Sequence, residues 1–229
     1  DGSKRVSYTI SDTAAAIAAQ IGSDDDLIKN ASGVTVISSA TENEAATLRT
    51  IHSFAGAIVF DISDTKAEIF IAAGSPSVPG AGSTFKDSTS INAARNVTVT
   101  DAINVDQGTT LRAATNSGSY TYSLSDTVAK VVAGGAELVN GATTVVTTGT
   151  DATHTQANTL AAFTKAVTYN IDASGTNLGL ATTTAAALNE AANITASGTS
   201  TVTAAAKILA ATNSGTTTLA AVSGSAADV

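Results

Sequence analysis

The chain of 229 residues contains no Cys, Met or Trp, and it contains only two Pro. Without Cys there can be neither a disulfide framework nor a thiolate metal site, so stability must come from packing and hydrogen bonds. Aromatic residues make up only 4% of the chain, although large side chains normally fill a broad globular interior. The apolar residues are mostly Ala, Val, Ile and Leu, which suit thin layers that lie close together.

Charged residues are also scarce, at 13% of the chain, and the net charge is -8. Nucleic acid is excluded as a partner, because neutralising phosphates requires clustered Lys and Arg. No apolar run approaches the ~20 residues that cross a bilayer, which argues against membrane insertion. Ser, Thr and Asn supply the polar surface instead. This composition is common on extracellular bacterial proteins, so we expect the chain at the cell surface or outside the cell.

One phrase occurs three times: "SYTISDTAAAIA" at 7–18, "VFDISDTKAEIF" at 59–70 and "TYSLSDTVAKVV" at 121–132. Strand-like centres recur at intervals of about 24 residues, the length of one solenoid coil. These centres are Ile10, Val36, Phe60, Thr98, Tyr122, Val146, Ile171, Ile194 and Thr218. The one long interval holds "GSPSVPGAGSTFKDSTS", residues 74–90, which predicts a looped-out insertion. The pattern predicts a single array over residues 1–229, cut from a longer chain.

Two positions in alternate coils predict a buried ladder. An aromatic residue is followed two places later by Ile or Leu, which is the period of one strand face. The aromatic positions are Tyr8, Phe60, Tyr122 and Tyr169, and the aliphatic positions are Ile10, Ile62, Leu124 and Ile171.

Other recurring residues predict helix ends. Thr41 with Glu44, and Thr153 with Gln156, match capping boxes before apolar runs at helical spacing. We predict that Asp12, Asp64 and Asp126 also cap helices, contributing about 1 kcal/mol each. Five glycines near the ends of helical runs are predicted to adopt a left-handed conformation. They are Gly33, Gly56, Gly118, Gly141 and Gly215.

The predicted fold is an α/β solenoid of right-handed coils, with a parallel sheet on one side and short Ala-rich helices on the other. An all-β solenoid is the alternative, although Ala favours helix over strand. A β-sandwich is disfavoured because helical runs recur so regularly.

Few residues suggest chemistry. His52 and His154 fall about four coils apart, so they cannot share a metal or a catalytic triad. Asp24, Asp25 and Asp26 are weak candidates for calcium, the one cofactor that the sequence leaves open, but adjacent side chains diverge and no ligand loop follows. No carboxylate pair stands at coil spacing for sugar hydrolysis. We therefore predict no catalytic residues and no enzyme.

The segment "YTISDTAAAIAAQIGSDDDLIKNASGVTVISSATENEAATL", the related residues 120–163 and the final "VSGSAADV" resemble long repetitive cell-surface proteins of cyanobacteria and other Gram-negative bacteria. The resemblance implies an extracellular array of surface layers, adhesion or motility, without catalytic residues. We expect a structural module of a secreted or cell-surface assembly, such as a surface layer (S-layer) or filament, whose partners are copies of itself or adjoining repeats. The alternative is an adhesin or phage-fibre module that binds surface polysaccharide.

Overall fold

A computed structural model of the chain describes residues 6–23, 25–53, 56–71 and 83–224. The chain divides into two compact units, Asp1–Tyr122 and Ser123–Val229. Short helices alternate with strands in both units, and most of the strands pair in parallel. These features confirm the predicted α/β class. The single array over residues 1–229 stays a prediction.

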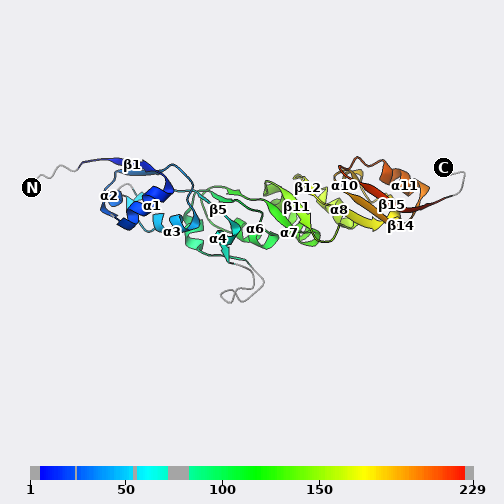
Figure 1. Cartoon of the computed structure of the whole chain (residues 1–229), viewed down its shortest axis with the longest axis horizontal. Coiled ribbons are helices and arrows are strands. Elements are labelled where there is room, and N and C mark those ends of the chain that lie inside the picture. Colours follow the sequence, from blue (N-terminus) through cyan, green and yellow to red (C-terminus); the bar gives the residue numbers. More distant parts are fainter. Residues whose placement is uncertain (1–5, 24, 54–55, 72–82, 225–229) are drawn as a thin grey trace, which may run out of the picture. The chain divides into compact units, whose positions relative to one another are not determined.

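The first unit consists of short strands and short helices. Its helices are α1 (Ala14–Ser23), α2 (Asp25–Lys29), α3 (Glu42–Leu48), α4 (Lys66–Ile69), α5 (Ser88–Ala93) and α6 (Val105–Arg112). Its strands are β1 (Thr9–Asp12), β2 (Gly33–Val36), β3 (His52–Ser53), β4 (Gly56–Ala57), β5 (Ile62–Asp64), β6 (Phe70–Ile71), β7 (Thr84–Phe85), β8 (Val97–Val99) and β9 (Tyr120–Thr121). Figure 1 shows β1 beside the helices that follow it.

Two parallel sheets organise this unit. The first is β1-β2, and the second has the order β5-β8-β9. An isolated parallel bridge also joins Ala40 to Ile62. Because a parallel partner requires a crossover, each pair encloses at least one helix. The unit also has two short antiparallel pairs, β3-β4 and β6-β7.

The predicted insertion, residues 74–90, is only partly described: residues 74–82 lie outside the described residues. The remainder, 83–90, belongs to regular structure. Strand β7 pairs antiparallel with β6, and the rings of Phe70 and Phe85 stack with centroids 5.5 Å apart. Helix α5 then begins at Ser88. The predicted loop is thus too long at its C-terminal end, because Phe85 supplies an apolar side chain that packs.

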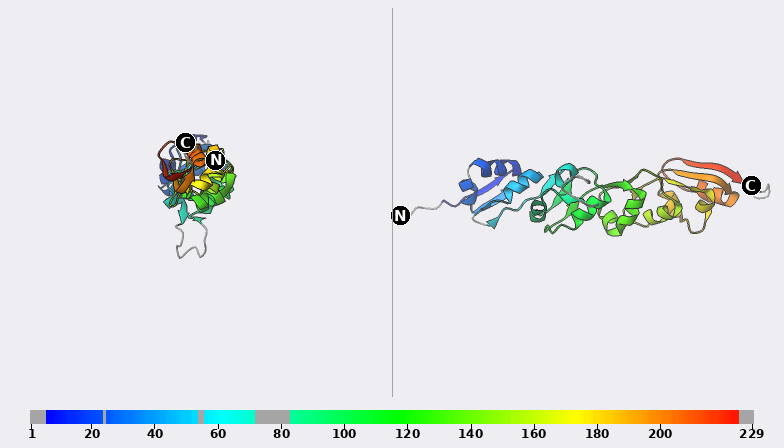
Figure 2. Two further views of the ribbon diagram at one scale, coloured as in Figure 1. Left: turned by 90° about the vertical axis from the view of Figure 1, so that its right-hand side faces the viewer. Right: turned by 90° about the horizontal axis from the view of Figure 1, so that it is seen from below.

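The second unit repeats the alternation with fewer irregular strands. Its strands are β10 (Leu124–Thr127), β11 (Val145–Thr148), β12 (Val167–Thr168), β13 (Ile171–Ser174), β14 (Ile194–Thr201) and β15 (Thr217–Ser223). Its helices are α7 (Val128–Gly141), α8 (His154–Leu160), α9 (Gly175–Gly179), α10 (Ala185–Asn189) and α11 (Val202–Leu209). They form two parallel sheets, β10-β11-β12 and β13-β14-β15. The arrows of β14 and β15 point the same way in Figure 2.

The two units share one order of pairings. In the first unit Ile10 pairs with Val34. A second series of paired residues runs from Ala40 to Ile62, then to Val97 and then to Tyr120. The second unit has the corresponding series: Leu124 with Val145, then Ala152, Ile171, Ile194 and Thr217. Each strand with the helix that follows it forms one layer. Apart from the step that contains residues 72–82, backbone hydrogen bonds between successive layers typically join residues 21 to 24 apart, for example the Ser32 N–H with the Tyr8 carbonyl and the Val97 N–H with the Ser119 carbonyl. The structure therefore contains one arrangement of strands twice.

Small apolar side chains form the core of both units. The aliphatic ladder positions Ile62, Leu124 and Ile171 are buried, and Ala45 and Ala157 are buried in the helices that cover the sheets. Burying one such aliphatic side chain contributes about 1.5–3 kcal/mol. The Ala-rich run "AAAIAAQIGS" forms helix α1, so the all-β alternative is wrong there. Helices α9 and α11 approach closely where a glycine faces an alanine: a Cβ on Gly179 would lie 2.4 Å from the Cβ of Ala204.

Candidate functional site

The predicted threonine caps are at the starts of two corresponding helices. Thr41 accepts from the backbone N–H of Glu44, whose carboxylate accepts the Thr41 N–H at 2.8 Å. Thr153 and Gln156 form the same capping box on α8. Both boxes bind backbone N–H groups at the start of the helix, which have no acceptor within the helix itself. These threonines therefore serve the backbone of their own helices.

Asp12, Asp64 and Asp126 are not the N-cap residues of the helices that follow them, so the predicted role at those helices is wrong. Each aspartate accepts the backbone N–H of the next residue, at 2.7 or 2.8 Å. That next residue is a threonine, and it stands immediately before the helix. The hydroxyls of Thr13 and Thr127 accept from the N–H three residues on. The two residues of the Ser-Asp-Thr phrase thus have different roles: the aspartate stabilises the turn, and the threonine occupies the cap position.

Some caps come from the next layer instead. The second carboxylate oxygen of Asp64 accepts the N–H of Glu42 at 3.0 Å, 22 residues away. Ser38 accepts the N–H of Ala14 in the same way at 3.0 Å. Asp64 lies on β5 and Ser38 just after β2, so each bond joins the start of one helix to the following layer and fixes neighbouring layers to each other.

The predicted aromatic ladder is buried at three of its four positions. Phe60, Tyr122 and Tyr169 are each 2% exposed. The hydroxyl of Tyr169 donates to the carbonyl of Ala187 at 2.9 Å, and burial raises the pKa of Tyr169 well above its usual range. Tyr8 and Ile10 are half-buried. Ile10 lies on β1 and Tyr8 immediately precedes it, and β1 has a strand partner on one side only among the described residues.

The residues considered for catalysis or metal binding do not come together in one site. His52 is exposed on β3, and His154 is half-buried at the first position of α8 in the other unit. Asp24 lies outside the described residues. Asp25 opens α2 and pairs with Lys29 at 3.2 Å, a typical solvated helix pair. Among the described residues, no group of three or more His, Cys, Asp or Glu is arranged to hold a metal ion.

Two corresponding asparagines bind the next layer. Asn96 Oδ1 accepts both the N–H and the hydroxyl of Ser119, each at 3.0 Å. Asn193 Oδ1 accepts the same two bonds from Thr216, at 2.9 and 3.0 Å. On their other side the amide groups donate to Asp61 at 2.9 Å and to Asn170 at 3.0 Å. Each asparagine therefore connects three successive layers through its side chain.

Further asparagines repeat this use. Asn92 accepts the N–H of Thr115, as Asn189 accepts that of Thr212. Asn116 donates to the carbonyl of Arg95 at 2.9 Å. The sequence predictions missed this set. The sequence feature that could have revealed these contacts is the hexapeptide "AATNSG", which occurs at 113–118 and again at 210–215.

The asparagines explain two of the predicted glycines. A Cβ on Gly118 would lie 2.4 Å from the carbonyl oxygen of Arg95 and from Oδ1 of Asn96. A Cβ on Gly215 would meet Asn193 and the Ala192 carbonyl at 2.4 and 2.5 Å. Among the described residues a left-handed φ occurs only at Gly56, Gly135, Gly149 and Gly198. The left-handed prediction is therefore right for Gly56 and wrong for Gly33, Gly118, Gly141 and Gly215.

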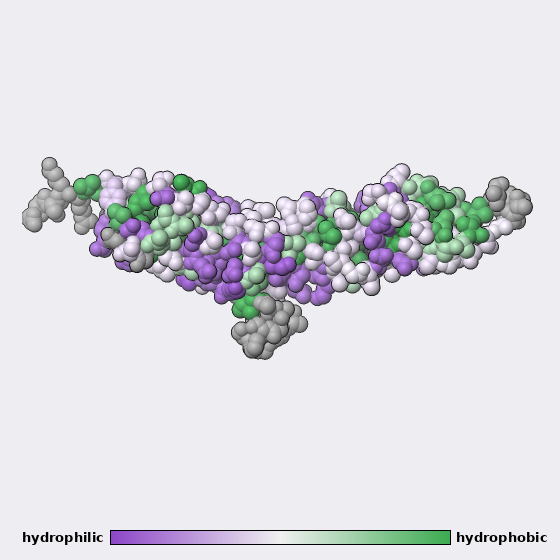
Figure 3. All heavy atoms as spheres, viewed as in Figure 1, coloured by the Kyte–Doolittle hydropathy of each residue, from purple (hydrophilic) through white to green (hydrophobic). Residues whose placement is uncertain are grey.

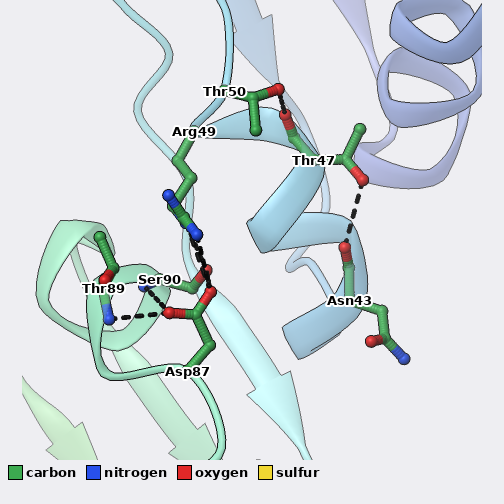
Figure 4. Close-up of polar contacts among 7 residues, drawn as sticks. All are labelled: Asn43, Thr47, Arg49, Thr50, Asp87, Thr89 and Ser90. Carbon is green, nitrogen blue, oxygen red and sulfur yellow. Dashed lines mark hydrogen bonds and ion pairs between the residues drawn. The ribbon is translucent and has the colours of Figure 1, made fainter.

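A charged cluster joins α3 to α5 in the first unit (Figure 4). The guanidinium of Arg49 donates to Asp87 at 3.1 and 3.3 Å, and to the hydroxyl of Ser90 at 3.0 Å. Asp87 also accepts the backbone N–H groups of Thr89 and Ser90, so it caps α5. Its bonds to Ser90 and Thr89 and the charge of Arg49 hold the pKa of Asp87 below its usual value, against the effect of burial.

Glu42 lies beside this cluster. Its side chain is 5% exposed at the first position of α3. Burial raises the pKa of Glu42, the carboxylates of Asp87, Asp64 and Glu68 raise it further, and Lys86 opposes them. The cluster is a set of contacts between helices, and its ion pair is partly shielded from water.

The outer strands of the two units present different surfaces from the inner ones. Among the described residues β15 pairs only with β14, and β1 only with β2. Ile194 on β14 is 1% exposed, whereas Leu219 on β15 is half-buried and Val222 is 49% exposed. Figure 3 shows apolar surface over the region of α11 and β15, where Leu209 is 62% exposed. Beside β1, Val6 is 77% exposed.

Comparison with protein-family models, with curated proteins and with solved structures finds no match to this chain. Within the part of the chain that the structure describes, no helix has the length and apolar character to cross a membrane. The free strand edges and the contacts between layers are therefore the features on which a function can be argued.

Proposed function

We propose that the chain is a non-catalytic structural module of a secreted or cell-surface assembly, and that it associates with copies of itself or with adjoining repeats. The proposed architecture is a right-handed α/β solenoid with coils of about 24 residues. One observation supports the proposal most directly. Asn96 and Asn193 make the same pair of bonds to the following layer in two units, with Ser119 and Thr216 as partners.

The polar side chains favour a structural function because they form hydrogen bonds with other residues of the chain. Asp61 accepts four hydrogen bonds, from the guanidinium of Arg95 at 2.7 and 2.9 Å and from the Asn96 backbone and amide at 3.0 and 2.9 Å. A carboxylate engaged in this way is a poor nucleophile or base, because its lone pairs are occupied. Its bond to Arg95 lowers the pKa of Asp61, which keeps it ionised.

Repetition also supports a mechanical function. Repeat proteins gain stability from contacts between nearest neighbours, and terminal repeats need a covering surface. Both described sheet ends, β1 and β15, leave an edge of this kind among the described residues. The extracellular location rests on the composition, poor in charge and rich in Ser, Thr and Asn, and on the resemblance to bacterial surface proteins.

Electron microscopy of the purified chain over a range of concentrations, with and without calcium, tests the proposal. We expect ordered filaments or sheets. Monomers at every concentration, together with specific hits on a glycan array, would instead establish the polysaccharide-binding alternative. Turnover of a polysaccharide that is lost when one carboxylate is replaced would overturn the non-catalytic assignment.

A further inference from the structure

We infer that the outer edge of β15 accepts strand β1 of a second copy of this chain in parallel, so that copies join head to tail. This inference rests on the proposed function and names the surface and the partner that the assembly uses. In the proposed register Leu219 of one copy lies beside Ile10 of the next, Thr218 beside Thr9, and Thr217 beside Tyr8.

The hydrogen-bond pattern of the sheets determines which backbone groups face outward. On β15 the carbonyl of Thr216 accepts from Ile194, so the groups of Thr217 and Leu219 face away from β14. On β1 the carbonyls of Tyr8 and Asp12 accept from residues after the next crossover, so the groups of Thr9 and Ser11 face away from β2. In the proposed register the Leu219 N–H donates to the carbonyl of Thr9, and the Ser11 N–H donates to the carbonyl of Leu219.

Exposure of the ladder residues indicates that, within the described residues, each edge lacks one neighbour. Ile171 and Ile194, which have ladder partners on both sides, are 0% and 1% exposed. Ile10 and Leu219 have a partner on one side only and are half-buried. Docking the two edges would give each of these side chains the apolar neighbour that inner layers have. Removing this apolar surface from water favours the contact.

The partner is a second copy because one chain carries both halves of the junction. All strands in β1-β2 and in the three three-stranded sheets pair in parallel, so an added strand with the same direction continues the ladder. Strand β1 has that direction, and Ile10 on the strand and Tyr8 just before it are both half-buried. The two edges differ, so the contact is heterologous and can repeat without closing.

The part of β15 that the proposed register uses also lacks most of the usual protection, since the register shift between β14 and β15 comes after Leu219. Natural edge strands avoid pairing with Lys, Pro, inward charges or bulges that twist the edge away. The sequence of β15, "TTLAAVS", has no charged residue and no Pro. Strand β1 has one charge, Asp12, and its carboxylate already accepts the N–H of Thr13.

Cross-linking of single-cysteine chains tests the inference, because the natural chain has no Cys. Thr9→Cys and Thr218→Cys chains are prepared separately, mixed and oxidised. Registered residues on neighbouring strands have the Cα separation that a disulfide requires. We expect disulfides between the two different chains in excess over those within either kind. A chain with Val146→Cys is the control, because Val146 is 41% exposed on β11, which is paired on both sides.

A second variant measures the energetics. Leu219→Lys is expected to weaken self-association by about tenfold or more, the effect of losing roughly 1.4 kcal/mol, whereas Val146→Lys leaves it unchanged. Disulfides of Thr218→Cys chains only with themselves would overturn the inference, because the edge would then pair with itself. Filaments without cross-linking between Thr9→Cys and Thr218→Cys chains would also overturn it, yet leave the proposed function standing.

Discussion

The side chain of Asn96 accepts both the backbone N–H and the hydroxyl of Ser119, each at 3.0 Å, across two neighbouring layers of the first unit. Asn193 and Thr216 have the same relationship in the second unit. A side-chain amide can satisfy strand backbone groups on both sides at once, because it has donors and acceptors in one plane. Its position therefore determines how layers follow each other.

Asn96→Ala is expected to destabilise the first unit by about 1–3 kcal/mol. The change removes the acceptor of the Ser119 N–H and one of the donors to the Asp61 carboxylate. Urea unfolding with circular dichroism measures this free energy. Asn43→Ala is the matched control, since Asn43 is exposed on α3 and Ala favours helix. Equal unfolding free energies for the two variants would show that the asparagine ladder has no energetic role.

Gly118→Ala is expected to destabilise the fold by about 1–3 kcal/mol or more, because the new Cβ would lie 2.4 Å from a backbone oxygen that cannot move freely. Gly33→Ala is the control. Its Cβ would lie 3.6 Å from a methyl group of Thr9, an ordinary contact, and its φ is not left-handed. We expect it to be neutral or to stabilise by about 0.4–1 kcal/mol.

Thermal unfolding followed by circular dichroism compares the two glycine variants directly. A Gly118→Ala protein as stable as Gly33→Ala would contradict the close approach seen between Gly118 and the Arg95 carbonyl.

Local patterns in the sequence predicted some of these features and missed others. The period-two pattern predicts burial at Phe60 and Tyr169, because strand faces alternate regardless of what they pack against. Capping boxes at Thr41 and Thr153 depend only on residues three apart. The aspartate caps were predicted wrongly because Asp and Thr are both good caps, and only the helix start distinguishes them.

Contacts between layers could not be predicted in the same way. Asn96 and Ser119 are 23 residues apart, as are Asn193 and Thr216, but on its other side Asn96 binds Asp61, 35 residues away. The offset therefore becomes evident only once the layers have been aligned. The glycines illustrate the same limit. Gly118 is required because a neighbouring layer approaches it, whereas the sequence suggests only the local reason, a left-handed turn.

Asp64→Ala is expected to cost more stability than Asp12→Ala. Asp64 accepts the N–H of Thr65 at 2.8 Å and that of Glu42 at 3.0 Å, and so joins two layers. Asp12 accepts the neighbouring N–H of Thr13 at 2.7 Å, and the following helix has its second cap from Ser38. Bonds to a charged acceptor contribute about 1.5–3 kcal/mol. Chemical denaturation of both variants measures the difference, and a larger loss for Asp12→Ala would contradict the proposed link between layers.

Glu42 gives the first unit a specific dependence on pH. Burial raises the pKa of its carboxyl above the usual 4.5, and the carboxylates of Asp87, Asp64 and Glu68 add to this while Lys86 opposes it. A raised pKa means that the folded state binds the proton more tightly than the unfolded state. The resulting stabilisation is complete below the unfolded pKa and is lost as the pH rises through the folded pKa. Asp61 and Asp87 act in the opposite sense, because their pKa values are lowered in the fold and their contribution is lost on acidification.

Glu42→Gln separates these effects, because glutamine stays neutral at every pH. The variant is expected to gain stability relative to the natural chain as the pH rises from about 4.5 through the folded pKa of Glu42, and the difference should then level off. Unfolding by urea at a series of pH values gives this difference. Glu190→Gln, at an exposed residue after α10, controls for removing a carboxylate and should change stability by less than about 0.5 kcal/mol. A difference between Glu42→Gln and the natural chain that stays constant with pH would show that Glu42 titrates equally in the folded and unfolded states, and that its burial does not penalise the charge.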